Sequence, residues 1–135
     1  MNILVVEDDF ISRKLLCRYL DPYGECDVAI NGIEAISAVR HALQCETPYD
    51  LICLDIMMPG KSGQETLKEV RELEKQHDPL GERPAKVIMT TALEDQENIR
   101  QAYEASADGY VVKPIEKKKF LAKLEELGLA VTAKV

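Results

Sequence analysis

The feature that most constrains this chain is a regular alternation of short apolar runs with stretches of helical periodicity. Several of the runs are continuously apolar and rich in β-branched residues, as expected of parallel strands covered on both faces. Five successive strand–helix units predict an α/β fold, namely a five-stranded, doubly wound parallel sheet with five helices. The expected strands are Ile3–Val6, Val28–Ile30, Leu51–Leu54, Val87–Met89 and Tyr110–Val112.

The expected helices are identified by apolar residues three or four positions apart. The Asn31-Gly32 pair could form a hairpin turn, but a helical pattern follows it, so we interpret it as a strand-to-helix turn. The weakest strand, Val28–Ile30, is placed at an edge of the sheet. The apolar stripes are Ile11, Leu15, Tyr19 and Leu20; Ile33, Ile36, Val39 and Leu43; Leu67, Val70 and Leu73; Ile99, Ala102 and Tyr103; and Phe120, Leu121, Leu124 and Leu127.

Length and charge narrow the class of protein. A chain of 135 residues is long enough for one domain with a sizeable core. The net charge of −7 argues against a nucleic-acid partner, because phosphate contacts require a basic face. No apolar run approaches the roughly 20 residues that span a bilayer, and the start of the chain lacks a signal peptide's basic region. The four cysteines form no CxxC pair and are expected to be reduced. We therefore expect a cytoplasmic protein.

Polar residues follow four of the expected strands, at the point where each strand ends. They are Glu7–Asp9, Asp55, Thr90–Thr91 and Lys113. Ligands of doubly wound sheets bind outside the carboxyl ends of the strands, so these residues mark the region of a site. If the first and third strands are neighbours, their carboxylates converge, and two such charges at about 4 Å repel by roughly 4 kcal/mol. Protonation, a metal ion or Lys113 could neutralise them.

Together these groups suit phosphoryl transfer to a carboxylate nucleophile. Mg²⁺ binds one or two carboxylates together with phosphate oxygens and water. Lys113 can bind a phosphoryl oxygen, and the Thr91 hydroxyl can donate to another. Each residue alone has a simpler account: Asp8 or Asp9 as a helix N-cap, Asp55 as a turn residue, and the others as solvated strand ends. The presence of all these groups at the strand ends favours the phosphoryl-transfer hypothesis.

In their order along the chain, these motifs resemble the receiver domain of response regulators in two-component signalling systems. The similar stretches are Val5–Asp9, Leu54–Gly63, Met89–Ala92 and Gly109–Pro114, the last as in stand-alone chemotaxis-type members. The resemblance implies a flavodoxin-like sheet with strand order 2-1-3-4-5, the order that is known for such domains. It also implies a receiver domain over residues 1–127, followed by a short tail over 128–135 without an output domain.

The resemblance assigns an acceptor and a metal site. Asp55 would be the phosphoacceptor. Asp8 and Asp55 would bind Mg²⁺, or Mn²⁺, with the backbone carbonyl of Met57, and Glu7 would assist through water. Met57 is apolar where some members carry a polar side chain, and we expect it, with Leu93, to crowd the hydrolytic water and to prolong the phosphorylated state.

The resemblance also assigns a switch and its partners. Thr91 and Lys113 would hold the phosphoryl group, and Tyr110 would change rotamer. The donor would be a sensor histidine kinase or a phosphotransfer protein. The output would be a protein contact, not catalysis, at the face of the fourth helix, fifth strand and fifth helix, where Lys117–Lys119 form a basic run.

Other classes of protein remain as alternatives. A receiver-like module could act by binding alone, although the intact acids, Thr91 and Lys113 disfavour this. A haloacid-dehalogenase-type phosphatase also uses an aspartate nucleophile with Mg²⁺, but its second aspartate is replaced here by Met57. A nucleotide- or flavin-binding module would need a glycine-rich motif after the first strand. We interpret His41 and His77 as surface residues and not as phosphotransfer histidines.

Overall fold

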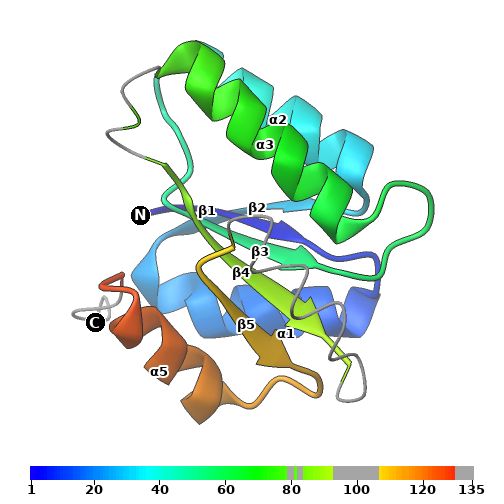
Figure 1. The fold of residues 1–135 in the computed structure, drawn as a ribbon. Coiled ribbons are helices and arrows are strands. Elements are labelled where there is room, and N and C mark those ends of the chain that lie inside the picture. The colour runs from blue at the N-terminus through cyan, green and yellow to red at the C-terminus, as the bar shows by residue number, and fades with distance from the viewer. Residues whose placement is uncertain (79–80, 82–83, 93–106, 130–135) are drawn as a thin grey trace.

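The structure, a computed structural model, describes residues 1–78, 81, 84–92 and 107–129. A central sheet is covered by α2 and α3 on one side and by α1 and α5 on the other (Figure 1). The elements are β1 (Asn2–Val6), α1 (Phe10–Leu20), the 3-10 helix η1 (Asp21–Tyr23), β2 (Glu25–Ala29), α2 (Gly32–Gln44), β3 (Leu51–Asp55), α3 (Gly63–His77), β4 (Lys86–Thr91), β5 (Gly109–Val112) and α5 (Lys117–Glu126).

The five strands are parallel and lie in the order β2-β1-β3-β4-β5, which confirms the expected sheet and its strand order. Strand β2 lies at an edge, as its weak apolar pattern predicted. In register, Val6 pairs with Leu54, and Asp55 pairs with Thr90. The carboxyl ends of β1, β3 and β4 therefore meet at one edge of the sheet.

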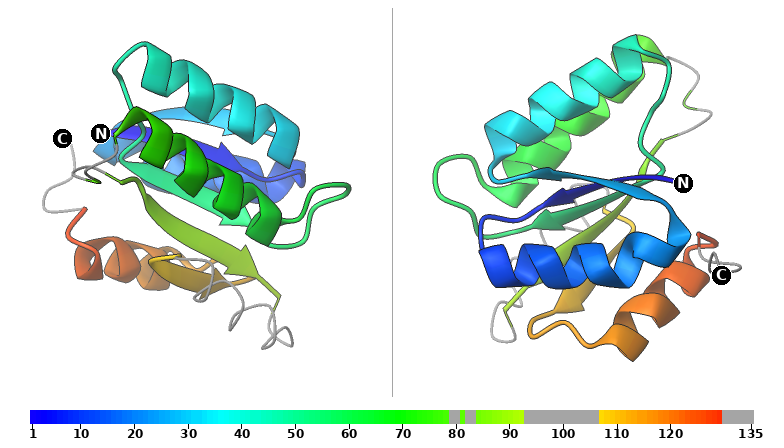
Figure 2. Two further views of the ribbon diagram at one scale, coloured as in Figure 1. Left: turned by 45° about the horizontal axis from the view of Figure 1, so that its top comes forward. Right: turned by 180° about the vertical axis from the view of Figure 1, so that it is seen from behind.

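The sheet lies between two layers of helices (Figure 2). Alternate residues of each central strand face opposite layers, and each layer has its own core. Leu4, Ile52 and Met89 belong to the cluster on the α2/α3 face. Val5 and Cys53 belong to the cluster on the α1/α5 face, which also contains Leu16, Leu20, Ile88, Val111, Phe120 and Leu124. Whether a strand residue holds an odd or an even position along its strand thus determines which pair of helices its side chain contacts.

Side-chain caps fix where the helices begin. The Asp9 carboxylate accepts a hydrogen bond from the Ser12 N–H at 2.9 Å, which places the N-cap of α1 two residues after Glu7 and one after Asp8. Asn31 caps α2 in the same way, which confirms the strand-to-helix turn. Ser62 caps α3, the helix that follows the loop after Asp55.

The structure corrects three details of the sequence interpretation. Strand β2 begins at Glu25 and ends at Ala29, because its backbone pairs with β1 from Asn2 onward whatever the polarity of its side chains. Helix α1 is rotated relative to its expected stripe, so that Leu16 and Leu20 are buried while Ile11 is 74% exposed. Ile33, at the start of α2, is likewise 71% exposed.

The described residues contain four α-helices where five were expected. The stripe of the missing one, Ile99, Ala102 and Tyr103, falls within 93–106, outside the described residues. Within the described ranges, no helix is long and apolar enough to cross a membrane. The four cysteines are free thiols, with Cys53 buried and Cys45 exposed at the end of α2.

Candidate functional site

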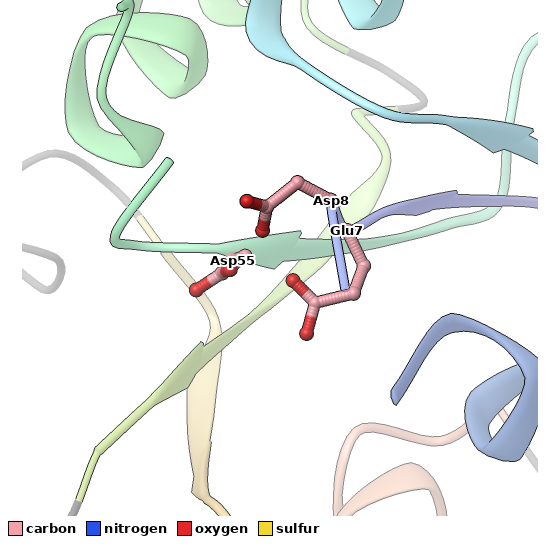
Figure 3. Close-up of side chains that lie close together, drawn as sticks. All are labelled: Glu7, Asp8 and Asp55. Atoms are coloured by element: carbon pink, nitrogen blue, oxygen red, sulfur yellow. The ribbon is translucent and has the colours of Figure 1, made fainter. Parts of the chain in front are cut away.

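Three carboxylates converge at the ends of β1 and β3 (Figure 3). One oxygen each from Glu7, Asp8 and Asp55 lies within 4.8 Å of the others. The convergence follows from the register, since Val6 pairs with Leu54 and the next residues of the two strands stand side by side. Glu7 is completely buried and Asp55 is 4% exposed, whereas Asp8 is exposed. The cluster therefore has a buried floor and one solvent-facing acid.

A lysine from the far edge of the sheet completes the cluster. The backbone N–H of Lys113 donates to the carbonyl of Thr91 at 2.7 Å, which continues the ladder beyond β5. The Lys113 Nζ lies 2.5 Å from Glu7 Oε1 and 3.3 Å from Asp55 Oδ2. Because β4 separates β5 from β3, the Lys113 side chain crosses the end of β4 to reach both acids.

The buried Asp55 carboxyl has a perturbed pKa. Burial, a side-chain hydrogen bond with Glu7 and the charge of Glu7 raise the pKa of Asp55 from 3.8 to about 8, against the opposing effects of Lys113 and the Met57 N–H. Burial lowers the pKa of Lys113, but its contacts with Glu7 and Asp55 outweigh this and leave that pKa raised. At neutral pH, Asp55 therefore keeps its proton unless a cation stabilises the ionised carboxylate.

The donor set suits a hard divalent cation. All three side chains offer carboxylate oxygens, the ligands that Mg²⁺ prefers. Glu7 Oε2 is buried without a hydrogen-bond partner, so it has a lone pair available for a cation-bound water. Asp55 Oδ1 accepts the Met57 N–H at 3.2 Å, which holds the loop after β3 against the cluster. The residues present therefore fit a metal ion.

The structure separates the acids of the Glu7–Asp9 motif. Asp9 is committed to capping α1 and lies outside the carboxylate cluster. Arg13, which sequence analysis did not single out, donates from Nη1 to the backbone carbonyl of Glu7 at 3.0 Å. Arg13 thereby fixes the backbone between β1 and α1. Only its position one turn into α1 could have suggested this contact.

The hydroxyl and aromatic residues of the expected switch lie at the end of β4 and in β5. Thr91 is buried, and its hydroxyl donates to the carbonyl of Ala92 at 3.4 Å. Tyr110 is half-buried and packs against the α2/α3 core. The residue paired with Asp55 is Thr90 and not Thr91. Sequence analysis did not assign Thr90 a role, although strand alternation with Ile88 would have placed it on the α1/α5 face.

Comparison with known proteins identifies the family. The sequence profile of the response regulator receiver domain matches residues 3–125. The chain is 37% identical to the transcriptional regulatory protein ResD of Bacillus subtilis, over 93% of this chain and 47% of ResD. It is 33% identical to the chemotaxis protein CheY of Halobacterium salinarum, over 86% of this chain and 87% of CheY. It thus spans about half the length of ResD but most of CheY.

A solved structure agrees in fold. The receiver domain of Ssk1 from Saccharomyces cerevisiae, crystallised with the histidine phosphotransfer protein Ypd1, superimposes with a TM-score of 0.78. It is 27% identical, and the match covers 97% of this chain and 92% of the other. The sequence match, the strand order and the acidic cluster facing a lysine agree with one another. The chain belongs to the response regulator receiver domain family, whose members are phosphorylation-activated signalling switches.

Proposed function

We propose that the switch of this chain operates by phosphorylation of Asp55. The observation that carries the proposal is the contact of Lys113 with both buried acids beside an exposed Asp8. This contact supports a carboxylate nucleophile that would lie between a cation site and a lysine, the groups that phosphoryl transfer to a carboxylate needs. The chain would support its own phosphorylation and slow dephosphorylation, not the turnover of a separate substrate.

The cation site would be formed by Asp8 and Asp55, with the Met57 backbone carbonyl and with Glu7 through water. Bound Mg²⁺, or Mn²⁺, would supply positive charge to the phosphoryl oxygens and favour the ionised form of the acids. Asp55 then becomes a free carboxylate whose orientation is kept by the Met57 N–H. Because Asp55 binds a proton up to about pH 8 in the absence of a cation, metal binding releases that proton.

In the transfer step, an Asp55 oxygen attacks the phosphorus of a phosphohistidine. The phosphorus–nitrogen bond breaks, and its electron pair returns to the imidazole of the donor. Lys113 moves from Glu7 to a phosphoryl oxygen, and the Thr91 hydroxyl leaves the weak 3.4 Å contact with Ala92 to bind another. Each new charge-assisted hydrogen bond contributes roughly 1.5–3 kcal/mol.

The phosphodonor would dock over the loops that surround Asp55. Large apolar residues are exposed at the beginning of α1, after β2, at the start of α2 and after β3: Phe10, Ile11, Ile30, Ile33 and Met57. Clusters of exposed apolar residues at one edge indicate a protein interface. The complex of the Ssk1 receiver with Ypd1 supports a phosphotransfer protein or a histidine kinase as this partner. Aspartate at Ile11 and Ile33 should weaken transfer from a protein donor while leaving labelling by a small-molecule donor unchanged.

The output protein would bind the face formed by β5, α5 and the expected fourth helix. Of these three elements, only the fourth helix lies outside the described ranges. Tyr110, packed against the α2/α3 core, would respond to the movement of Thr91. Lys117–Lys119 are exposed at the start of α5, where cations oppose the helix dipole, and they favour an acidic partner surface. Charge reversal of two of these lysines should lower the affinity for the output protein.

Intact-mass measurement after incubation with a small-molecule phosphodonor and Mg²⁺ tests the central proposal. Wild-type protein should gain one acid-labile phosphoryl group, and Asp55→Asn should gain none, because an amide is a poor nucleophile. Asp21→Asn, which changes an exposed carboxyl at the end of α1, serves as the matched control and should be labelled normally. Labelling of Asp55→Asn at the wild-type level would overturn the assignment. Sustained turnover of a simple phosphomonoester would favour the phosphatase alternative.

A further inference from the structure

Two buried side-chain polar atoms have no hydrogen-bond partner within the described part of the chain: Glu7 Oε2 and Thr90 Oγ1. Buried polar groups in folded proteins almost always have a partner, and a buried hydroxyl without one destabilises the fold. Glu7 Oε2 belongs to the carboxylate cluster, where a cation-bound water can reach it. No such account covers Thr90, which is only 1% exposed and therefore out of reach of bulk water.

The fold places Thr90 directly beside the proposed acceptor. In the β3–β4 ladder, Thr90 pairs with Asp55, and neighbouring strands lie about 4.8 Å apart. Ile88 and Cys53, two residues before Thr90 and Asp55, both belong to the α1/α5 core. By strand alternation, the Thr90 hydroxyl and the Asp55 carboxyl therefore stand on the same face of the sheet.

Both carboxylate oxygens of Asp55 face a donor before phosphorylation, but one of these donors would move away when the phosphoryl group binds. Oδ1 accepts the Met57 N–H at 3.2 Å, and this bond comes from the backbone next to the acceptor. Oδ2 lies 3.3 Å from Lys113 Nζ, the group that the proposed function transfers to the phosphoryl oxygens. Once Lys113 has moved, Oδ2 loses its donor, and the residue that pairs with Asp55 in the ladder, Thr90, offers a buried hydroxyl without a partner among the described residues.

We propose that the Thr90 hydroxyl is a leaving-group donor that assists loss of the phosphoryl group from Asp55. The inference rests on the proposed function, since it requires an aspartyl phosphate at Asp55. A water oxygen bonds to phosphorus, the bond from phosphorus to the Asp55 oxygen breaks, and its electron pair stays on the carboxylate while inorganic phosphate leaves. The developing charge is shared by both carboxylate oxygens, so a hydrogen bond from Thr90 to either one stabilises the transition state. The same bond breaks when the phosphoryl group returns to a phosphodonor, so Thr90 assists that step as well.

Two substitutions separate the hydroxyl from the shape of the side chain. Thr90→Val keeps the shape and removes the hydroxyl, whereas Thr90→Ser keeps the hydroxyl and removes the methyl group. Thr66→Val is the matched control, because Thr66 in α3 is also a fully buried threonine, but its hydroxyl donates to the backbone carbonyl of Ser62. Each protein is phosphorylated with a small-molecule donor, freed of the donor, and followed by intact mass in Mg²⁺.

The phosphorylated Thr90→Val protein should decay about tenfold more slowly than wild type, since one hydrogen bond to a charged group changes a rate by roughly that factor. Thr90→Ser and Thr66→Val should decay at rates near the wild-type rate. Equal decay of wild type and Thr90→Val would overturn the role of Thr90 while leaving the proposed function intact, because both proteins would still have been labelled. Slow decay of Thr90→Ser with normal decay of Thr90→Val would assign the effect to packing and also overturn the proposal. If Thr90→Val does not fold, Thr90→Ala is the second hydroxyl-free variant and carries the same expectation.

Discussion

Replacing Asp55 by asparagine is expected to stabilise the fold while it removes the proposed acceptor. The carboxyl of Asp55 is buried beside Glu7, and its pKa is raised from 3.8 to about 8. In the unfolded chain the group loses its proton near pH 4, but in the folded chain it keeps the proton up to about pH 8. The folded state therefore binds more protons than the unfolded state across this window. As a result, the free energy of unfolding is unaffected by this group below about pH 4 and decreases as the pH rises from about 4 to about 8.

The size of the effect follows from the same shift. At about 1.4 kcal/mol per pH unit, holding Asp55 in the folded state lowers the free energy of unfolding by up to about 4 kcal/mol at pH 7. Asparagine has nearly the same shape and carries no charge, so Asp55→Asn should recover most of this amount. Because the gain depends on ionisation of the unfolded state, it should shrink towards zero near pH 4.

Urea unfolding followed by far-ultraviolet circular dichroism measures this gain, since the chain has no tryptophan to report by fluorescence. The measurement is made at several pH values, with a chelator and then with Mg²⁺. Mg²⁺ should raise the free energy of unfolding of wild type and leave that of Asp55→Asn nearly unchanged. The exposed control Asp21→Asn should change stability by less than about 0.5 kcal/mol at any pH. An Asp55→Asn protein no more stable than wild type at pH 8 in chelator would refute the argument from burial and repulsion.

Three further predictions concern the metal, the switch and the lifetime. Asp8→Ala should weaken Mg²⁺ binding sharply, as measured by calorimetry. Asp9→Ala should change the Mg²⁺ affinity little but lower the free energy of unfolding by about 1 kcal/mol, because Asp9 is the N-cap of α1. A larger loss of Mg²⁺ affinity in Asp9→Ala than in Asp8→Ala would contradict the alignment of the acidic motif. Thr91→Ala should accept the phosphoryl group but show a reduced change in the NMR environment of Tyr110. Moving a two-state switch from 1:99 to 99:1 needs about 5.5 kcal/mol, which the two hydrogen bonds from Thr91 and Lys113 barely supply. A full wild-type change in this mutant would exclude Thr91 from the switch. Met57→Asn should shorten the lifetime of the phosphorylated protein. The Met57 side chain is apolar and 63% exposed, whereas the amide of asparagine can orient the hydrolytic water. Equal rates of phosphoryl loss in wild type and mutant would reject the idea that Met57 hinders this water.

The sequence by itself determined the sheet and the chemical character of its edge. Continuous apolar runs predict parallel strands reliably because such a strand is buried on both faces. Its residues are therefore apolar whichever strands and helices pack against it. The acids, Thr91 and Lys113 were located for a related reason, since each lies at the end of a strand or shortly after it. The turn at Asn31-Gly32 was also readable, because the helical pattern after it excludes a hairpin.

The sequence was less informative where an element is exposed on one side. Strand β2 was predicted too short and too late, because backbone pairing with β1 fixes an edge strand even when its side chains are polar. Ile11 and Ile33 were predicted to face the core, since periodicity shows that a helix has an apolar stripe but not that every member of it is buried. Both side chains are instead largely exposed to solvent.

Only the tertiary structure decided how the strand-end groups relate to one another. That Lys113 contacts Glu7 as well as Asp55 depends on a side chain crossing the end of β4, which no spacing along the chain encodes. The separation of Asp9 from the carboxylate cluster depends on where α1 begins. The position of Thr90 beside Asp55 depends on the register of β3 with β4, and register is set by which backbone groups pair when the whole sheet packs between its helices.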